Sequence, residues 1–143
     1  MRHHSLEVER VVPGPIDEVF DAWLDPKLLS QWMTPGSGMS VPAAEVDPVV
    51  GGRFRIVMRA GDRDIPHEGE YRVIERPTRL VFTWTSEPAG KDTLVSIVFT
   101  PLSDGETRVS LTHDRFASDS ARDSHRRGWG EILDALARSV AAR

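Results

Sequence analysis

Histidine is the residue type whose ordinary pKa lies closest to neutral pH, so the five histidines of this chain are the first candidates for chemistry. His67 is followed directly by Glu68, as in the helical motif of zinc proteases. That motif needs a second histidine at the position where this chain has Tyr71. No other histidine pair has the spacing of helical metal ligands, and the nucleophile-elbow, P-loop and dinucleotide-binding glycine patterns are absent from the sequence. We therefore expect neither a metal site nor a cofactor.

His113 and His125 remain as candidates for contact with a bound molecule. His113 follows two apolar residues in an alternating pattern, which predicts that its side chain faces the interior. It is then either a core histidine hydrogen-bonded to a backbone carbonyl, which we favour, or a polar handle for a ligand. His125 lies one helical turn before Trp129 and either reaches a cavity mouth or is a solvated residue, which we favour slightly. An acid–base pair of His67 or Glu68 with His113 is a weaker hypothesis.

Aromatic and methionine side chains form the second group of candidates. Individually, each is more typical of a core than of a binding site. Collectively they are informative, because wide aromatic rings and adaptable methionines suit a site for flat or flexible apolar molecules. The set consists of Trp32, Met33, Met39, Met58, Tyr71, Trp84, Phe116 and Trp129. Gly128 and Gly130 flank Trp129, which either allows a helix to pack closely or leaves room for a ligand.

The composition restricts the class of protein. A chain of 143 residues with 39% hydrophobic and 28% charged residues is long enough for one globular domain, residues 1–143. Its net charge of −4 argues against nucleic-acid binding, and the lack of cysteine excludes disulfides and thiolate chemistry. No apolar run approaches the roughly 20 residues of a membrane span, and no signal-peptide pattern opens the chain. We therefore expect a cytoplasmic protein without a membrane partner.

The last quarter of the chain predicts the element that positions many of these residues. Apolar residues with the spacing of one helix face are Trp129, Ile132, Leu133, Leu136 and Val140. They predict an amphipathic helix over residues 117–140, with Ser118 or Ser120 as its N-cap. Such a helix needs a large apolar partner surface.

The preceding residues supply that surface, because most of them alternate between apolar and polar types. The patterns predict one edge strand at 6–12, short helices at about 16–23 and 27–32, and a loop at 35–42. Six strands are then expected between residues 43 and 113, and Gly69 is expected to interrupt one of them. The predicted fold class is α+β: a curved antiparallel sheet of about six to seven strands wrapped around a long C-terminal helix, with a space between the two layers.

Ordered segments along nearly the whole chain resemble one superfamily. They are PIDEVFDAWLDP at 15–26, GGRF at 51–54, GEY at 69–71, LVFTW at 80–84, FTP at 99–101, LTH at 111–113 and HRRGW at 125–129. The chain is similar to the START-like (SRPBCC) superfamily, and within it to the domain homologous to the activator of the ninety-kilodalton heat-shock protein's ATPase. This resemblance implies a helix-grip fold. Members include co-chaperone domains, lipid and polyketide binders, and cyclases, so the resemblance implies no single function. The eukaryotic co-chaperone has a further N-terminal domain without a counterpart in this sequence, so a chaperone is the least favoured partner.

Our leading hypothesis is non-catalytic binding of a small hydrophobic or aromatic molecule between the sheet and the C-terminal helix. The expected ligand-binding residues are Trp32, Met39, Phe54, Met58, His67, Tyr71, Trp84, His113, Phe116, Trp129 and Leu133. One alternative is a cyclase- or hydrolase-type enzyme that uses a cavity histidine as general base. Another is a co-chaperone-like or stress-response interaction module, or a homodimer, formed by an exposed apolar patch near Trp32, Met33 and Met39; the same loop could instead be a lid.

Overall fold

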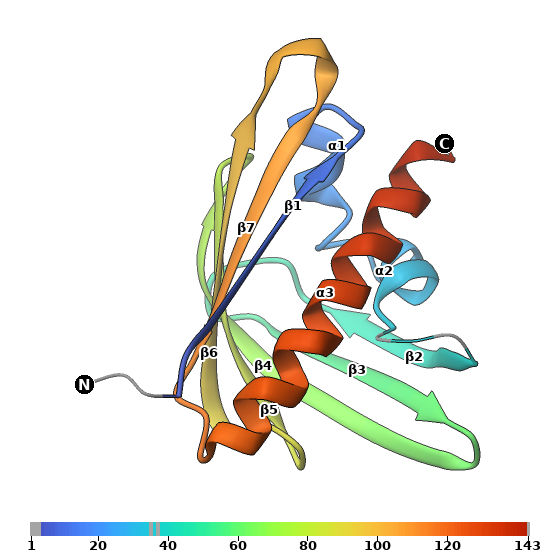
Figure 1. The fold of residues 1–143 in the computed structure, drawn as a ribbon, viewed down its shortest axis with the longest axis vertical. Coiled ribbons are helices and arrows are strands. Elements are labelled where there is room, and N and C mark those ends of the chain that lie inside the picture. The colour runs from blue at the N-terminus through green and yellow to red at the C-terminus, as the bar shows by residue number, and fades with distance from the viewer. Residues whose placement is uncertain (1–3, 35, 37, 143) are drawn as a thin grey trace.

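The computed structural model describes residues 4–34, 36 and 38–142, which form an antiparallel sheet and three α-helices (Figure 1). The strands are β1 (Leu6–Val12), β2 (Met39–Val46), β3 (Arg53–Ala60), β4 (Arg63–Glu75), β5 (Arg79–Ser86), β6 (Gly90–Pro101) and β7 (Thr107–Asp114). The helices are α1 (Ile16–Asp21), α2 (Pro26–Trp32) and α3 (Asp119–Ala141), with a short 3-10 turn, η1 (Ser103–Gly105), between β6 and β7. This is the predicted order of one strand, two short helices, six strands and one long helix.

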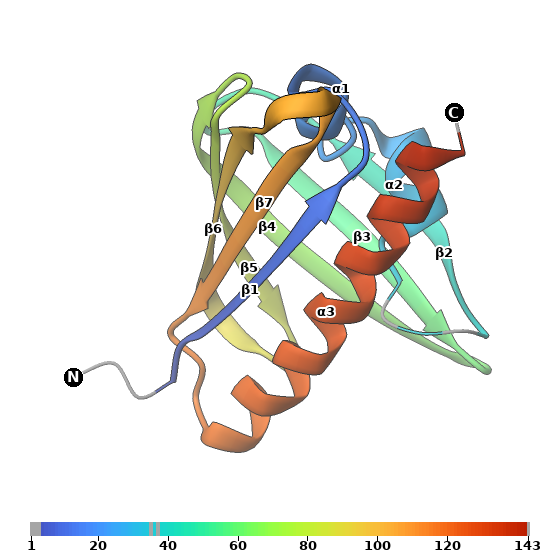
Figure 2. The same ribbon diagram turned by 45° about the horizontal axis from the view of Figure 1, so that its top comes forward.

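The strands follow one another across the sheet almost in chain order. The sheet order is β1-β7-β6-β5-β4-β3-β2, and every neighbouring pair is antiparallel. β2 to β7 therefore form a meander, and β1 pairs with β7. Figure 2 shows the sheet curved into a half-barrel, with α3 lying across its open side. The predicted α+β fold class, a curved antiparallel sheet around a long C-terminal helix, is confirmed.

Helix α3 is held by its cap and by its apolar face. The Ser118 hydroxyl accepts a hydrogen bond from the backbone N–H of Ala121 at 3.1 Å, so Ser118 and not Ser120 is the N-cap. Asp119 lies in the first turn and Arg138 in the last, where each charge opposes the helix dipole of that end. All five residues of the predicted apolar face are buried in the core between the helix and the sheet.

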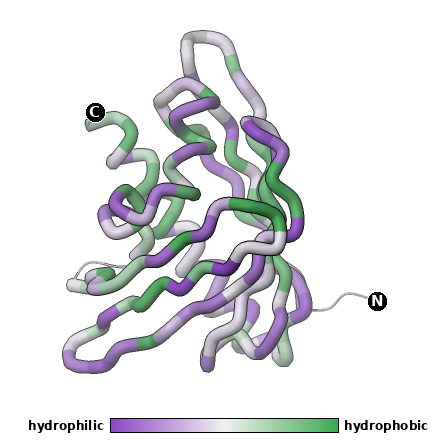
Figure 3. The backbone as a smooth tube through the Cα atoms, turned by 180° about the vertical axis from the view of Figure 1, so that it is seen from behind, coloured by the Kyte–Doolittle hydropathy of each residue, from purple (hydrophilic) through white to green (hydrophobic). Residues whose placement is uncertain are grey.

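The strands alternate as expected, with one face toward α3 and the other toward solvent. Green and purple segments alternate along the tube in Figure 3, and the tip of the β3–β4 hairpin is purple, which marks hydrophilic residues. β4 runs unbroken through Gly69, so the predicted interruption is wrong. Gly69 pairs with Phe54 of β3, and a Cβ at Gly69 would collide with the backbone oxygen of Thr83 and lie 2.5 Å from the Phe54 ring. The glycine makes room for the neighbouring strand and for that ring instead of ending the strand.

Two element starts lie earlier than predicted. Helix α2 begins at Pro26, because the Asp25 carboxylate caps it and accepts from the backbone N–H groups of Lys27 and Leu28. Strand β2 begins at Met39, within the stretch predicted as a loop. Pro42 is tolerated there because β2 is at the edge of the sheet and its register shifts between Ser40 and Ala43.

Candidate functional site

A hollow of about 330 Å³ lies between the sheet and the first half of α3, and we call it the central cavity. Its lining residues come from β2, β3, β4, β5, the β5–β6 turn and α3. They are Met39, Met58, Ile65, His67, Trp84, Pro88, Ser124, His125, Arg127, Gly128, Trp129, Glu131 and Ile132. The hollow adjoins the region between sheet and helix in which the sequence analysis expected a ligand.

The wall of the central cavity is apolar where it is deepest. Met58 and Trp84 are inward-facing residues of β3 and β5, and Trp129 and Ile132 belong to the buried face of α3. Each is at most 4% exposed, and the ring centroids of Trp84 and Trp129 lie 5.1 Å apart. Strand alternation and helix periodicity therefore bring four apolar side chains from three elements to one wall.

His67 is a polar group on this wall. Its side chain is 5% exposed, its ring lies 4.9 Å from the Trp84 ring, and its Nδ1 has no hydrogen-bond partner. Burial lowers the pKa of His67 to about 4, an effect that the backbone carbonyl of Ile56 opposes and nearby His125 reinforces. His67 is therefore a neutral imidazole at pH 7.

Trp84 carries the second polar group of the wall. Its indole Nε1–H is buried and has no hydrogen-bond partner. Most buried polar atoms in proteins have a partner, so an unpartnered donor in the lining of a cavity calls for a physical explanation. The buried indole N–H groups of Trp23 and Trp32, which do not line this cavity, also have no partner, so this feature is not specific to the cavity.

His113 lies behind Trp129 and is completely buried. Its Nδ1 accepts a hydrogen bond from Trp129 Nε1–H at 2.9 Å, so the ring proton must be on Nε2. Nε2 lies 2.8 Å from Thr93 Oγ1 and donates to it, which leaves the threonine hydroxyl to donate to the carbonyl oxygen of Trp84. Four groups from α3, β7, β6 and β5 thus form one chain of hydrogen bonds.

This chain defines the role of His113. Burial, together with nearby His125, lowers the pKa of His113 to about 2, and both ring nitrogens are occupied. The expectation of an inward-facing core histidine was right, but its partners are two side chains and not a backbone carbonyl. His113 positions Trp129 and has no nitrogen available as a general base.

His125 lies close to both the central cavity and buried His113. It lines the central cavity and is half-buried, and its Nδ1 donates to the carbonyl oxygen of Ala121 at 2.8 Å. Burial lowers the pKa of His125, although that hydrogen bond acts in the opposite direction. The preference for a solvated His125 was therefore wrong, because the helix turn before Trp129 faces the cavity mouth.

The structure brings together five of the residues predicted to bind a ligand, and six lie elsewhere. Those that line the central cavity are Met39, Met58, His67, Trp84 and Trp129. His113 and Phe116 pack on each other with ring centroids 4.1 Å apart, and Leu133 is fully buried in the core.

The other three predicted residues are buried outside the lining of the central cavity. Phe54 and Tyr71 line a small hollow of about 10 Å³ that Trp84 shares, and burial raises the pKa of Tyr71. Trp32 packs edge-on against Trp23 with ring centroids 4.7 Å apart and is fully buried. The expected exposed patch is therefore not formed by Trp32, nor by Met33, which is 1% exposed.

Several lining residues were not in the predicted set. Ser124, Arg127, Glu131 and Ile132 come from the same face of α3 as Gly128. Helix periodicity around Trp129 is the signal that could have identified them. No periodic sequence pattern marks Ile65 and Pro88 as lining residues, because their positions depend on the path of the hairpins in three dimensions.

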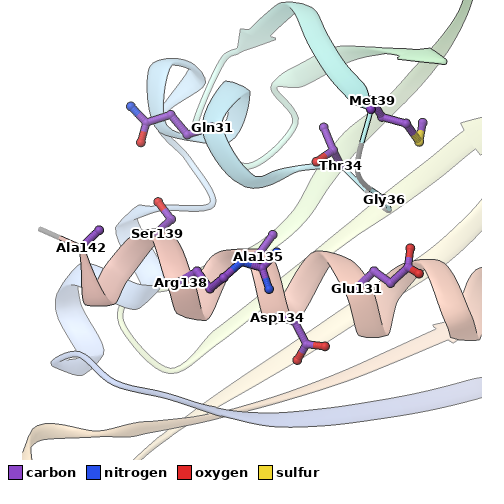
Figure 4. Close-up of a pocket in the computed structure, with 11 residues that line it drawn as sticks. Gln31, Thr34, Gly36, Met39, Glu131, Asp134, Ala135, Arg138, Ser139 and Ala142 are labelled. Atoms are coloured by element: carbon purple, nitrogen blue, oxygen red, sulfur yellow. The ribbon is translucent and has the colours of Figure 1, made fainter. Parts of the chain in front are cut away.

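A second hollow of about 690 Å³, the α2–α3 groove, adjoins the central cavity through Met39 and Glu131, which line both. Its lining residues are Gln31, Thr34, Gly36, Gly38, Met39, Glu131, Asp134, Ala135, Arg138, Ser139 and Ala142. In Figure 4, Glu131 points toward the segment that holds Gly36, whereas Asp134 points away from it. Asp134 is paired instead with Arg10 of β1 at 2.9 Å. The groove is mostly polar and lacks the aromatic wall of the central cavity.

Two further features are absent from residues 4–34, 36 and 38–142. Within these ranges no three side chains of histidine, aspartate or glutamate are grouped so that they could hold a metal ion. Within the same ranges no helix has both the length and the apolar character needed to cross a membrane.

Comparison with known proteins agrees with the fold. The sequence profile of the family described as "Activator of Hsp90 ATPase homolog 1-like protein" matches residues 13–141. An AHSA1-like protein from Aeromonas hydrophila is 31% identical, with a TM-score of 0.82 over 96% of this chain and 92% of that one. An AHSA1 protein from Silicibacter pomeroyi is 25% identical, with a TM-score of 0.83 over 96% of this chain and 98% of that one.

A protein from Chromobacterium violaceum is also 25% identical, with a TM-score of 0.84 over 96% of both chains. Among curated proteins, none matches. The resemblance stated from the sequence is confirmed, and the chain belongs to the family of Activator of Hsp90 ATPase homolog 1-like proteins.

Proposed function

We propose that the protein binds a small, mainly apolar molecule in the central cavity. The observation that supports this proposal is the open hollow of about 330 Å³ whose deep wall is Met58, Trp84, Trp129 and Ile132. Ligand sites typically measure about 300–1,000 Å³ and are lined by apolar and aromatic side chains with few polar groups. The central cavity has that size and that composition.

The two buried histidines, His67 and His113, are unsuited to general-base catalysis. The enzyme hypothesis needs a histidine that takes up a proton near neutral pH. Both nitrogens of His113 are engaged, and His67, with a pKa of about 4, is a weak base at pH 7. We therefore propose a binding protein in which neither histidine acts as a general base.

A thermal-shift screen with flat apolar probes such as naphthalene tests the proposal. A ligand at about one hundred times its Kd should raise the Tm of a domain of this size by roughly 10 °C. Gly128→Leu is the blocking variant, because Gly128 lines the central cavity and a leucine there would occupy it. Ala135→Leu is the matched control, since it adds the same side chain to the α2–α3 groove.

Ligand should stabilise the wild type and Ala135→Leu and leave Gly128→Leu unchanged. The proposal fails if no probe of a broad apolar panel raises the wild-type Tm. It also fails if Gly128→Leu responds as strongly as the wild type, because the ligand would then bind elsewhere.

A further inference from the structure

The exposed polar side chains that line the central cavity are gathered along one edge of α3. They are Ser124, Arg127 and Glu131, whereas the four residues of the deep wall are at most 4% exposed. Residues three and four apart are neighbours on a helix surface, so these three side chains form one continuous edge, which we call the rim. A molecule that fills the cavity would therefore meet apolar side chains at its inner end and polar ones where it reaches solvent.

The positive charge of the rim is Arg127. Of the lining residues that the structure describes, Arg127 and Glu131 are the charged ones. In Figure 4, Glu131 points toward the segment that holds Gly36, which borders the α2–α3 groove. His125 and His67 are neutral at pH 7, because burial lowers the pKa of each. A ligand group at the rim therefore meets a cation at Arg127, while the carboxylate lies toward the adjoining groove.

Arg127 differs from the neighbouring arginines of α3 in having no ion-pair partner among the described residues. Arg122 and Arg126 are both paired with Asp123, at 2.9 Å and 3.4 Å. The pKa of Asp123 is lowered chiefly by its hydrogen bond with Arg122, and Arg127 contributes least. The guanidinium of Arg127 thus has its N–H donors available for a group outside the protein, and the Ser124 hydroxyl lies one helical turn earlier on the same rim.

We propose that the ligand is an amphipathic anion whose apolar body lies against the deep wall of the central cavity and whose carboxylate accepts hydrogen bonds from Arg127 at the rim. A guanidinium matches a carboxylate with two parallel hydrogen bonds. The rim is exposed, so the head group keeps part of its water and avoids the desolvation that a charge would suffer against the deep wall. A neutral head group would leave the cation without a counter-charge, and a cationic one would be repelled by it.

This inference rests on the proposed function and is tested with probes that share one ring system and differ in the head group. The probes are naphthaleneacetate, naphthaleneethanol and naphthaleneethylamine, which are anionic, neutral and cationic near neutral pH, with naphthalene as the probe without a head group. Equilibrium dialysis measures their affinities at low and at high salt. At low salt we expect the wild type to bind naphthaleneacetate about fivefold more tightly than naphthaleneethanol, and naphthaleneethylamine most weakly. This preference should shrink at high salt, because charges at an exposed rim are screened.

Two variants assign the preference to one side chain. Arg127→Gln removes the charge and keeps a long polar side chain. It should lower the affinity for naphthaleneacetate about fivefold and change the affinity for naphthaleneethanol by less than about twofold. Arg126→Gln is the matched control, because it removes the same charge from an adjacent exposed residue that does not line the central cavity. It should change the affinity for either probe by less than about twofold.

The outcomes separate this inference from the proposed function. If naphthaleneethanol or naphthaleneethylamine binds the wild type at least as tightly as naphthaleneacetate, the inference is overturned while the apolar site stands. The same holds if Arg127→Gln and Arg126→Gln weaken naphthaleneacetate equally, or if neither weakens it. The wild-type series at two salt concentrations gives an answer even where a variant fails to fold. If none of the four probes binds, the proposed function and this inference both fail.

Discussion

Replacing Thr93 by valine tests the hydrogen-bond chain that joins α3 to the sheet. The change keeps the shape of the side chain and removes the hydroxyl that lies 2.8 Å from His113 Nε2. The ring cannot respond by moving its proton to Nδ1, because Trp129 Nε1–H points at that atom. Thr93→Val therefore leaves a buried N–H without an acceptor and the carbonyl oxygen of Trp84 without this donor.

The expected loss follows from these unpaired groups. A buried polar group left without its partner costs about 1–3 kcal/mol, so Thr93→Val should lower the free energy of unfolding by that amount. Thr93→Ser is the matched control, because it keeps the hydroxyl and removes one methyl group, which costs about 0.8 kcal/mol. Valine should therefore be the more destabilising replacement although it is the more apolar one.

Urea denaturation followed by tryptophan fluorescence measures both variants, with equal m-values as the check that the unfolding transition is comparable. Nitrogen chemical shifts of His113 give an independent readout and should report a neutral ring protonated on Nε2. The reasoning is refuted if Thr93→Val is as stable as the wild type or more stable than Thr93→Ser. It is also refuted if the His113 ring carries its proton on Nδ1.

Three further predictions concern pH, a cap and a close contact. His67 and His113 have folded pKa values of about 4 and about 2, below the ordinary 6.5, so the unfolded chain binds more protons than the folded one below that pH. The contribution of the two neutral histidines to the free energy of unfolding should be fully present above about pH 6.5. It should fall as the pH decreases, by up to about 1.4 kcal/mol per pH unit for each histidine. An unfolding free energy that does not change between about pH 7 and 5 would contradict this. Ser118→Ala should cost about 1 kcal/mol in urea unfolding, while Ser120→Ala should change stability by less than about 0.5 kcal/mol, and equal effects would contradict the observed cap. Gly69→Ala should lower the unfolding free energy by about 1–3 kcal/mol, because the new Cβ would collide with the backbone oxygen of Thr83 and lie 2.5 Å from the Phe54 ring; an unchanged Tm would refute these contacts.

Much of the fold could be predicted because it depends on periodic patterns. The five apolar residues from Trp129 to Val140 are spaced as one helix face, and all five are buried in the structure. Strand alternation likewise predicted the inward direction of His113. Two errors of element boundary occurred at residues that usually break a helix or a strand. Asp25 ends one helical segment and caps the next, and Pro42 belongs to an edge strand whose register shifts beside it.

The site was less predictable, because its polar chemistry depends on which side chains meet across the fold. Alternation placed His113 inside but could not show that Trp129 and Thr93 would occupy both of its nitrogens. The same pattern placed His67 and Tyr71 on one face of β4. The curvature of the sheet then put His67 on the central cavity and Tyr71 beyond Trp84, and curvature has no periodic signal.

The hydrogen bond from Trp129 to His113 has a consequence for how the central cavity would receive a molecule. An indole ring on a cavity wall can usually rotate, and a ligand must then immobilise it at an entropic cost of about 0.5–1.5 kcal/mol. Here the ring is already anchored from behind by a fully buried imidazole. The wall is therefore preorganised in the ligand-free protein. The entropic cost of ordering the ring is part of folding and does not reduce the binding free energy of a ligand.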